Sequence, residues 1–297
     1  MTDNPETTIA REAAPETRVE SRREPDGYAA VLTHVQRDAP ERLACARALA
    51  QRFGAALIGV GAEAIPPLAA GPATGMVQAQ WIAAGSQAAE ENMRAAREMF
   101  ETACAGLQAG GEWQASLDLP VEVMTRASRA ADLIVASAPD GAANRYRDAR
   151  PSDLALATGR PVLVAPLGEK VLSAQRVVLA WRDTREARRA MVDALPFFRR
   201  AEAVLVLEVG GPRLEDAHRR CADVASALQR HGVRAEPSAV AASRRTEGEE
   251  ILTQSWAFGA DLIVAGAYGH SRLGETIFGG VTRALLSQHA LFVLLSH

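Results

Sequence analysis

The chain contains an internal repeat, and this repeat limits its fold more than any other feature of the sequence. The hexapeptide ADLIVA occurs twice, at residues 131–136 and 260–265. Upstream of the two copies, segments 37–41 and 182–186 also align, and each half alternates short apolar runs with helical periodicity. Parallel strands joined by right-handed helical crossovers have this pattern. The repeat therefore predicts an α/β protein with two tandem, doubly wound parallel-sheet domains of the Rossmann-like or flavodoxin-like kind.

The pattern divides the chain into a tail, two domains and a linker. Residues 1–26 mix charges with proline and threonine and lack an apolar period, which predicts a disordered tail. The first domain is expected at 27–168 and the second at 176–297. Strands are expected at 29–35, 55–60, 132–136, 161–166, 177–181, 203–209, 262–265 and 291–295, with helices that include 78–107, 121–130 and 248–259.

Composition narrows the functional classes. The 297 residues are 48% hydrophobic and 23% charged, with a formal net charge of -3, which is typical of a globular protein and argues against a nucleic-acid binder. No apolar run approaches the length needed to span a bilayer, and the polar N-terminus does not resemble a secretory signal. Three scattered cysteines favour a reducing compartment. We therefore expect a cytoplasmic protein with no membrane partner.

A glycine-rich loop follows the second ADLIVA copy and is a candidate phosphate site. Gly266, Gly269 and the pair Gly279-Gly280 punctuate it, and a helical pattern begins at Val281. Open α/β sheets bind ligands at the carboxyl ends of their strands. A helix N-terminus preceded by glycines also offers free backbone N–H groups and a positive dipole end to an anion.

The duplicated layout, the two ADLIVA copies and the G-x2-G-x9-G spacing of Gly266, Gly269 and Gly279 together resemble the universal stress proteins, in their tandem-domain bacterial form. The resemblance covers residues 27–297. It implies a role in stress response or regulation, and an adenine nucleotide, ATP with Mg only as its companion, bound in the C-terminal half. The three glycines would then hold the phosphates and ribose.

The resemblance also indicates individual site residues. The family's Ser or Thr after the third glycine is Gly280 here, and the nearest hydroxyl belongs to Thr282. The family's Asp after the first strand falls at Arg182, with Asp183 one residue later, where its side chain can point away from the site. The set of candidate residues is Asp183, Val209, Gly266, Gly269, His270, Arg272, Gly279, Gly280, Val281 and Thr282. Val209 matches the residue whose backbone meets the adenine, and Arg272 is a candidate phosphate donor.

The first half departs from the motif. Ser137 and Asp140 stand where the second half has Gly266 and Gly269, and Ala149-Arg150 stands near the place of Gly279-Gly280. We expect this half to be a degenerate structural partner and not a second nucleotide site. Family likeness also implies that the last strands of the two halves, at 161–165 and 291–295, pair within the chain, while a homodimer stays open.

Other chemistries find little support. The sequence has no HExxH or zinc-ligand spacing, no G-x4-G-K-[ST] and no G-x-G-x-x-G. Nothing in it supplies a poised base, nucleophile or metal, which predicts a protein that is not an enzyme and acts through unknown protein partners. Two alternatives stay open: a weak ATPase or related nucleotide hydrolase, and a protein-interaction scaffold that binds no nucleotide.

Overall fold

The computed structural model describes residues 27–68, 75–138, 144–168, 170–210, 213–241, 243–269 and 280–297. The tail expected at 1–26 lies outside this range. The first half comprises β1 (Ala30–His34), α1 (Pro40–Phe53), β2 (Ala56–Ala62), α2 (Gly75–Cys104), β3 (Gly111–Ser116), α3 (Pro120–Ala127), a 3-10 turn (Ser128–Ala130), β4 (Leu133–Ser137), α4 (Pro151–Thr158) and β5 (Val162–Ala165). The second half comprises β6 (Arg176–Ala180), α5 (Arg185–Asp193), α6 (Leu195–Phe198), β7 (Ala203–Val209), α7 (Leu214–Arg230), β8 (Ala235–Val240), α8 (Glu247–Phe258), β9 (Leu262–Gly266), α9 (Gly280–Ser287) and β10 (Phe292–Ser296).

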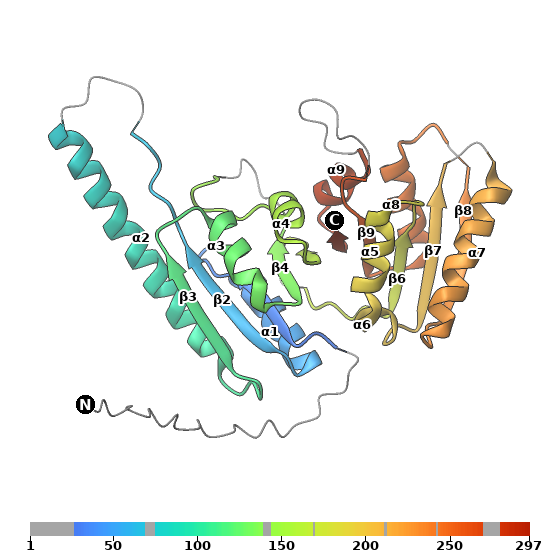
Figure 1. Ribbon diagram of the computed structural model, residues 1–297, viewed down its shortest axis with the longest axis horizontal. Coiled ribbons are helices and arrows are strands. Elements are labelled where there is room, and N and C mark those ends of the chain that lie inside the picture. The colour runs from blue at the N-terminus through green and yellow to red at the C-terminus, as the bar shows by residue number, and fades with distance from the viewer. Residues whose placement is uncertain are drawn as a thin grey trace, which may run out of the picture.

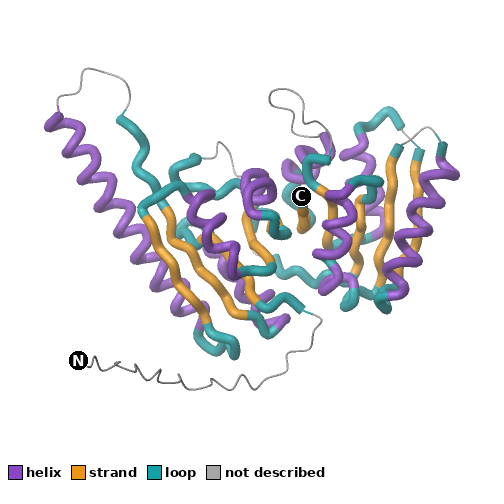
Figure 2. Tube along the Cα trace, in the orientation of Figure 1, coloured by secondary structure: helices purple, strands orange, loops and turns teal. Residues whose placement is uncertain are grey.

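The two halves share one sheet. Its ten strands follow the order β3-β2-β1-β4-β5-β10-β9-β6-β7-β8, so each half has a doubly wound arrangement (Figures 1 and 2). Neighbouring strands within each half are parallel, whereas β5 and β10 pair antiparallel, with Val164 opposite Val293. The expected pairing of the last strands within the chain is thus confirmed, and it turns two tandem sheets into a continuous one.

The repeated aspartate of ADLIVA explains how each half brings its first and fourth strands together. The Asp132 carboxylate accepts hydrogen bonds from the backbone N–H groups of Ala29 and Ala30, at 2.7 and 3.1 Å. Asp261 repeats this with Gln175 and Arg176, at 3.1 and 3.3 Å. The aspartate satisfies N–H groups at the start of the neighbouring strand, and the apolar LIVA run after it pairs with that strand.

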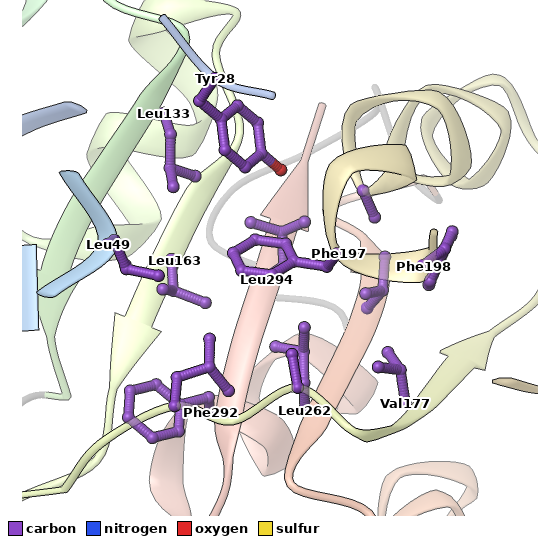
Figure 3. Close-up of a cluster of buried hydrophobic side chains, with 14 of the residues drawn as sticks. Tyr28, Leu49, Leu133, Leu163, Val177, Phe197, Phe198, Leu262, Phe292 and Leu294 are labelled. Atoms are coloured by element: carbon purple, nitrogen blue, oxygen red, sulfur yellow. The ribbon is translucent and has the colours of Figure 1, made fainter. Parts of the chain in front are cut away.

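Alternation along the strands divides the core into two layers. On β4, Leu133 and Val135 pack on the face covered by α1, while Ile134 and Ala136 pack on the face covered by α3 and α4. All four are buried, because a strand covered on both faces is apolar throughout. Figure 3 shows part of the first layer, in which strand residues of both halves, such as Leu163, Leu294 and Leu262, lie side by side.

An aromatic cluster joins the halves within this layer. Tyr28 and Phe53 of the first half meet Phe197 of α6, with ring centroids 5.0 to 5.5 Å apart. The Tyr28 hydroxyl also donates to the backbone oxygen of Asp193, at 2.6 Å. The sheet and this cluster therefore fix the two halves together along both the β5–β10 pair and the α5–α6 segment.

Candidate functional site

A cavity of about 340 Å³ opens at the carboxyl edge of the second half. The ends of β6, β7 and β9 line it, together with the first residues of α8 and α9. Chain order reverses between β6 and β9, since β7 and β8 lie on one side and β10 on the other. This is the switch point at which doubly wound sheets bind ligands, and the volume lies in the range of small-molecule sites.

Most described members of the candidate set line this cavity: Val209, Gly266, Gly269, Gly280, Val281 and Thr282. Asp183 does not, because its carboxylate forms an exposed ion pair with Arg188 on α5. The residue that faces the cavity in its place is Arg182. His270, Arg272 and Gly279 lie outside the described residues.

The three described glycines have different surroundings. A Cβ atom on Gly266 would lie 2.6 Å from the backbone nitrogen of Ala187, so the close approach of α5 to β9 requires glycine there. A Cβ atom on Gly269 would lie 3.2 Å from the Glu186 carboxylate, which is tight. Around Gly280 no described atom lies within 4 Å of that position.

Opposite charges face each other at the cavity. The Arg182 guanidinium donates to both carboxylate oxygens of Glu247, at 2.8 and 2.9 Å, and both side chains are about half exposed. Glu186 is buried beside the glycines and accepts from Arg185 at 2.5 Å. Burial favours its neutral acid, but hydrogen bonds from Arg185 and Thr184 favour the carboxylate and lower the pKa of Glu186 overall.

Sequence reasoning missed several lining residues: Trp181, Thr246, Glu247, Gly248 and Tyr268. The signal for the α8 start was present, since Thr246 and Glu249 form a capping box that fixes where the helix begins. Tyr268 adopts a positive φ of 61°. Burial raises its pKa, and a hydrogen bond with Ser152 of α4 acts in the opposite direction, so this residue also links the cavity to the first half.

At the equivalent place, the first half has a large charged side chain where the second half has a small one. Arg42 is the third residue of α1, as Ala187 is of α5, and its buried guanidinium donates to the backbone oxygen of His34 and to Gln36, each at 2.7 Å. The segment 144–148 lies across the strand ends, with its Tyr146 oxygen accepting from the Ala64 N–H at 2.7 Å. These contacts agree with a half that serves as a structural partner.

A larger cavity, about 750 Å³, lies at this place in the first half. Arg42, Ser152 and Lys170 line it, and Leu286 of α9 contributes from the second half. The Lys170 ammonium donates to two backbone oxygens near the start of β10, and Arg147 pairs with Glu63. Its cations thus contact protein groups, and Ser137, Ala149 and Arg150 line it where the second half has its glycines.

Two further classes of site were sought in the part of the chain that the structure describes. It holds no cluster of three or more metal-ligating side chains. It also holds no helix of the length and apolarity needed to cross a bilayer.

Comparisons with known proteins place the fold. The chain matches no protein-family model, and a search of curated proteins finds no match. A universal stress protein from Archaeoglobus fulgidus DSM 4304 is similar in structure, with a TM-score of 0.66 at 15% identity, over 90% of this chain and 97% of that one. A functionally unknown protein from Pseudomonas aeruginosa PAO1 gives 0.54 at 13% identity, over 91% and 93%. The chain therefore has the tandem α/β fold seen in a universal stress protein.

Proposed function

We propose that this chain is a universal stress protein that acts in stress response or regulation and binds an adenine nucleotide, ATP with its Mg, in the C-terminal half. The observation that carries the proposal is the cavity at the β6–β9 switch point, onto which the start of α9 opens. Three candidate glycines and Thr282 lie around it.

The charge distribution favours the α9 end for a phosphate. Two helices begin at the cavity, and α8 already has Glu247, Glu249 and Glu250 in its first turn. The first turn of α9 has no acidic residue, so its positive dipole end favours an anion there. The apolar lining residues Val209 and Ile251 lie on β7 and α8 and supply a surface for a base.

Binding fits this lining better than catalysis does. Among the described lining residues, Glu247 is the one carboxylate, and Arg182 already engages it. A general base must be free to take a proton, so the pair favours a binding role over the hydrolase alternative. The same pair leaves the described lining with no net charge, which favours modest affinity and keeps the nucleotide-free scaffold as the second candidate.

Gly280 provides the test. Because its surroundings are open, Gly280→Asp introduces a carboxylate at the helix start without a clash. The helix dipole should stabilise the folded variant by ~0.3–1 kcal/mol, while the new charge repels phosphate. We expect calorimetric titration with Mg-ATP to show affinity at least about tenfold weaker, a loss of ~1.4 kcal/mol. Trp181 at the cavity offers a fluorescence readout.

Gly280→Ser is the matched control. It fits the same open space and adds a hydroxyl donor, so we expect ATP affinity equal to or above that of the original chain. A chain that ignores Mg-ATP in both readouts would favour the scaffold. Steady release of ADP would instead favour the hydrolase. Equal binding by the Asp and Ser variants would place the phosphates away from α9 and contradict the proposed site.

A further inference from the structure

The first turns of α2 form an exposed, uncharged helical surface. Residues 75–84 are all exposed, and Met76 and Trp81 retain 73% and 42% of their accessible area. From Gly75 to Ala89 the helix has no charged residue. Figure 1 shows this end of α2 extending past the strands at the β3 side of the molecule. Apolar surface of this extent on a projecting helix marks an interaction site.

The helix has two distinct faces. Ala89, Ala96 and Phe100, at spacings of seven and four, are buried on the face by which α2 packs on the sheet, and Ala96 and Phe100 belong to the core layer there. Nearer the N-terminus, segment 63–68 supports the helix: a Cβ atom on Gly85 would touch Ile65, and the Trp81 indole donates to the Pro66 oxygen at 2.9 Å. Another face carries Val77, Trp81, Ala84 and Ala88, all exposed and at i, i+4, i+7 and i+11. We name these four residues the α2 stripe. Their spacing is that of a two-helix contact.

We propose that the α2 stripe is the docking surface for a second copy of this chain, with the two α2 helices antiparallel about a two-fold axis level with residues 82 and 83. In that register Trp81 faces Ala84 of the partner subunit, and Val77 faces Ala88 of the partner subunit. Each large side chain meets a small one, which lets the two helices interdigitate. In a parallel pair in register, Trp81 would instead face its own copy and the alanines would leave gaps.

Charge favours the same arrangement. Glu91 continues the stripe one turn beyond its end, and in the antiparallel pair it lies level with position 74, one residue before the other helix begins. The first turn of α2 contains no acidic residue, so its positive dipole end is free to attract that carboxylate. A parallel pair would oppose Glu91 to its own copy and gain nothing from the dipole.

The other occupants fit less well. Helices that lie on membranes carry Lys or Arg along their polar face, and the stretch from Gly75 to Ala89 has none. The N-terminal segment 1–26 is strongly charged and poor in large apolar residues, so it has little to bury against Trp81. A second copy brings the same uncharged stripe. The contact spans about four turns, which places it at the small end of stable interfaces and predicts a concentration-dependent dimer.

Sedimentation velocity of the full chain over a wide concentration range tests the surface. We expect the mass to rise from the 31.6 kDa of one chain toward twice that value. Trp81→Glu should keep the chain monomeric throughout, because it buries a charge against the partner's Ala84. The matched control is Trp256→Glu, which changes the 54% exposed tryptophan of α8 and should dimerise normally. A monomer at all concentrations, or a dimer that Trp81→Glu leaves intact, would overturn the proposal.

Disulfide trapping tests the orientation. In a Cys104→Ser background, which removes the half-exposed native thiol, the double variant Val77→Cys, Ala88→Cys should form an intermolecular disulfide under mild oxidation. Val77→Cys alone should not, because the two copies of residue 77 lie about 16 Å apart along the antiparallel pair. Efficient trapping of the single variant would mean a parallel pair and would refute the register. Native circular dichroism of each variant confirms that it is folded.

Discussion

Gly266→Ala tests whether the first glycine of the loop is required by packing and not only by a ligand. The added Cβ atom would lie 2.6 Å from the Ala187 nitrogen and 2.7 Å from the Glu186 carbonyl carbon. Both are backbone atoms at the start of α5, so no side-chain rotation can relieve the contact. The helix as a whole must withdraw from β9.

The size of the effect follows from these distances. Non-bonded heavy atoms pack best at ~3.5 Å, so α5 has to retreat by about 0.9 Å from the 2.6 Å contact. That movement loosens Ala187 and Ala190, which are both fully buried against the sheet. Overpacking of this kind costs ~1–3 kcal/mol, and because a whole helix moves we expect ~2–3 kcal/mol.

The first half indicates why glycine is needed only once. There Ser137 ends β4 at the place where Gly266 ends β9. Residues 35–39 connect β1 to α1, whereas the shorter segment 181–184 connects β6 to α5. The longer connection gives α1 room to accommodate a side chain on Ser137, while the shorter one draws α5 against the backbone of Gly266.

Urea unfolding followed by circular dichroism measures the effect, with Gly280→Ala as the matched control. Gly280 has open surroundings and begins a helix, so alanine there should change the free energy of unfolding by no more than ~1 kcal/mol, in the stabilising direction. If Gly266→Ala lowers the free energy of unfolding by less than ~0.5 kcal/mol, α5 is not held against β9 as described, and the packing argument fails.

Two further predictions concern the first half and its junction with the second. Phe197→Ala should lower stability by ~3–5 kcal/mol, since its fully buried ring contacts Tyr28 and Phe53 across the junction, and urea unfolding should separate into two transitions. A single transition at the original midpoint would contradict this. Burial, assisted by the positive charge of Arg42, lowers the pKa of His34 to about 3. The unfolded chain has a histidine pKa of ~6.5 and therefore binds the proton at a higher pH than the folded chain does. The free energy of unfolding is fully present above pH ~6.5 and falls by up to ~1.4 kcal/mol per pH unit from there down to about pH 3. His34→Gln should flatten this slope in urea titrations at neutral and mildly acidic pH, and an unchanged slope would exclude His34 as its source.

Much of the fold could be predicted because its strands are buried on both faces. Runs such as residues 203–209 and 262–265 are continuously apolar, and the structure places strands at both. β3 was not located from the sequence, since this edge strand is largely exposed and its GEWQAS segment has no apolar period. α4 (Pro151–Thr158) was also not assigned.

The site was less accessible to sequence reasoning, because contacts between distant segments decide it. The described glycines of the predicted loop line the cavity, but the role of Gly266 depends on how closely α5 approaches, which no spacing reveals. Asp183 was expected near the ligand. The chain after β6 turns its carboxylate toward Arg188 and presents Arg182 instead. Tyr268 joins the lining through a positive φ that is rare for tyrosine and leaves no mark in the sequence.

The two halves show how one duplicated unit can provide two differently lined sites. In each, the strand after the ADLIVA aspartate ends beside the third residue of that half's first helix. Where that residue is Ala187 and its neighbour is Gly266, space remains at the start of α9. Where the residue is Arg42, its guanidinium reaches His34 and Gln36 and lines a cavity that lacks those glycines. Because the β5–β10 pair and the Tyr28–Phe197 cluster unite the halves, the first half can lose the glycine-lined site and still stabilise the second half.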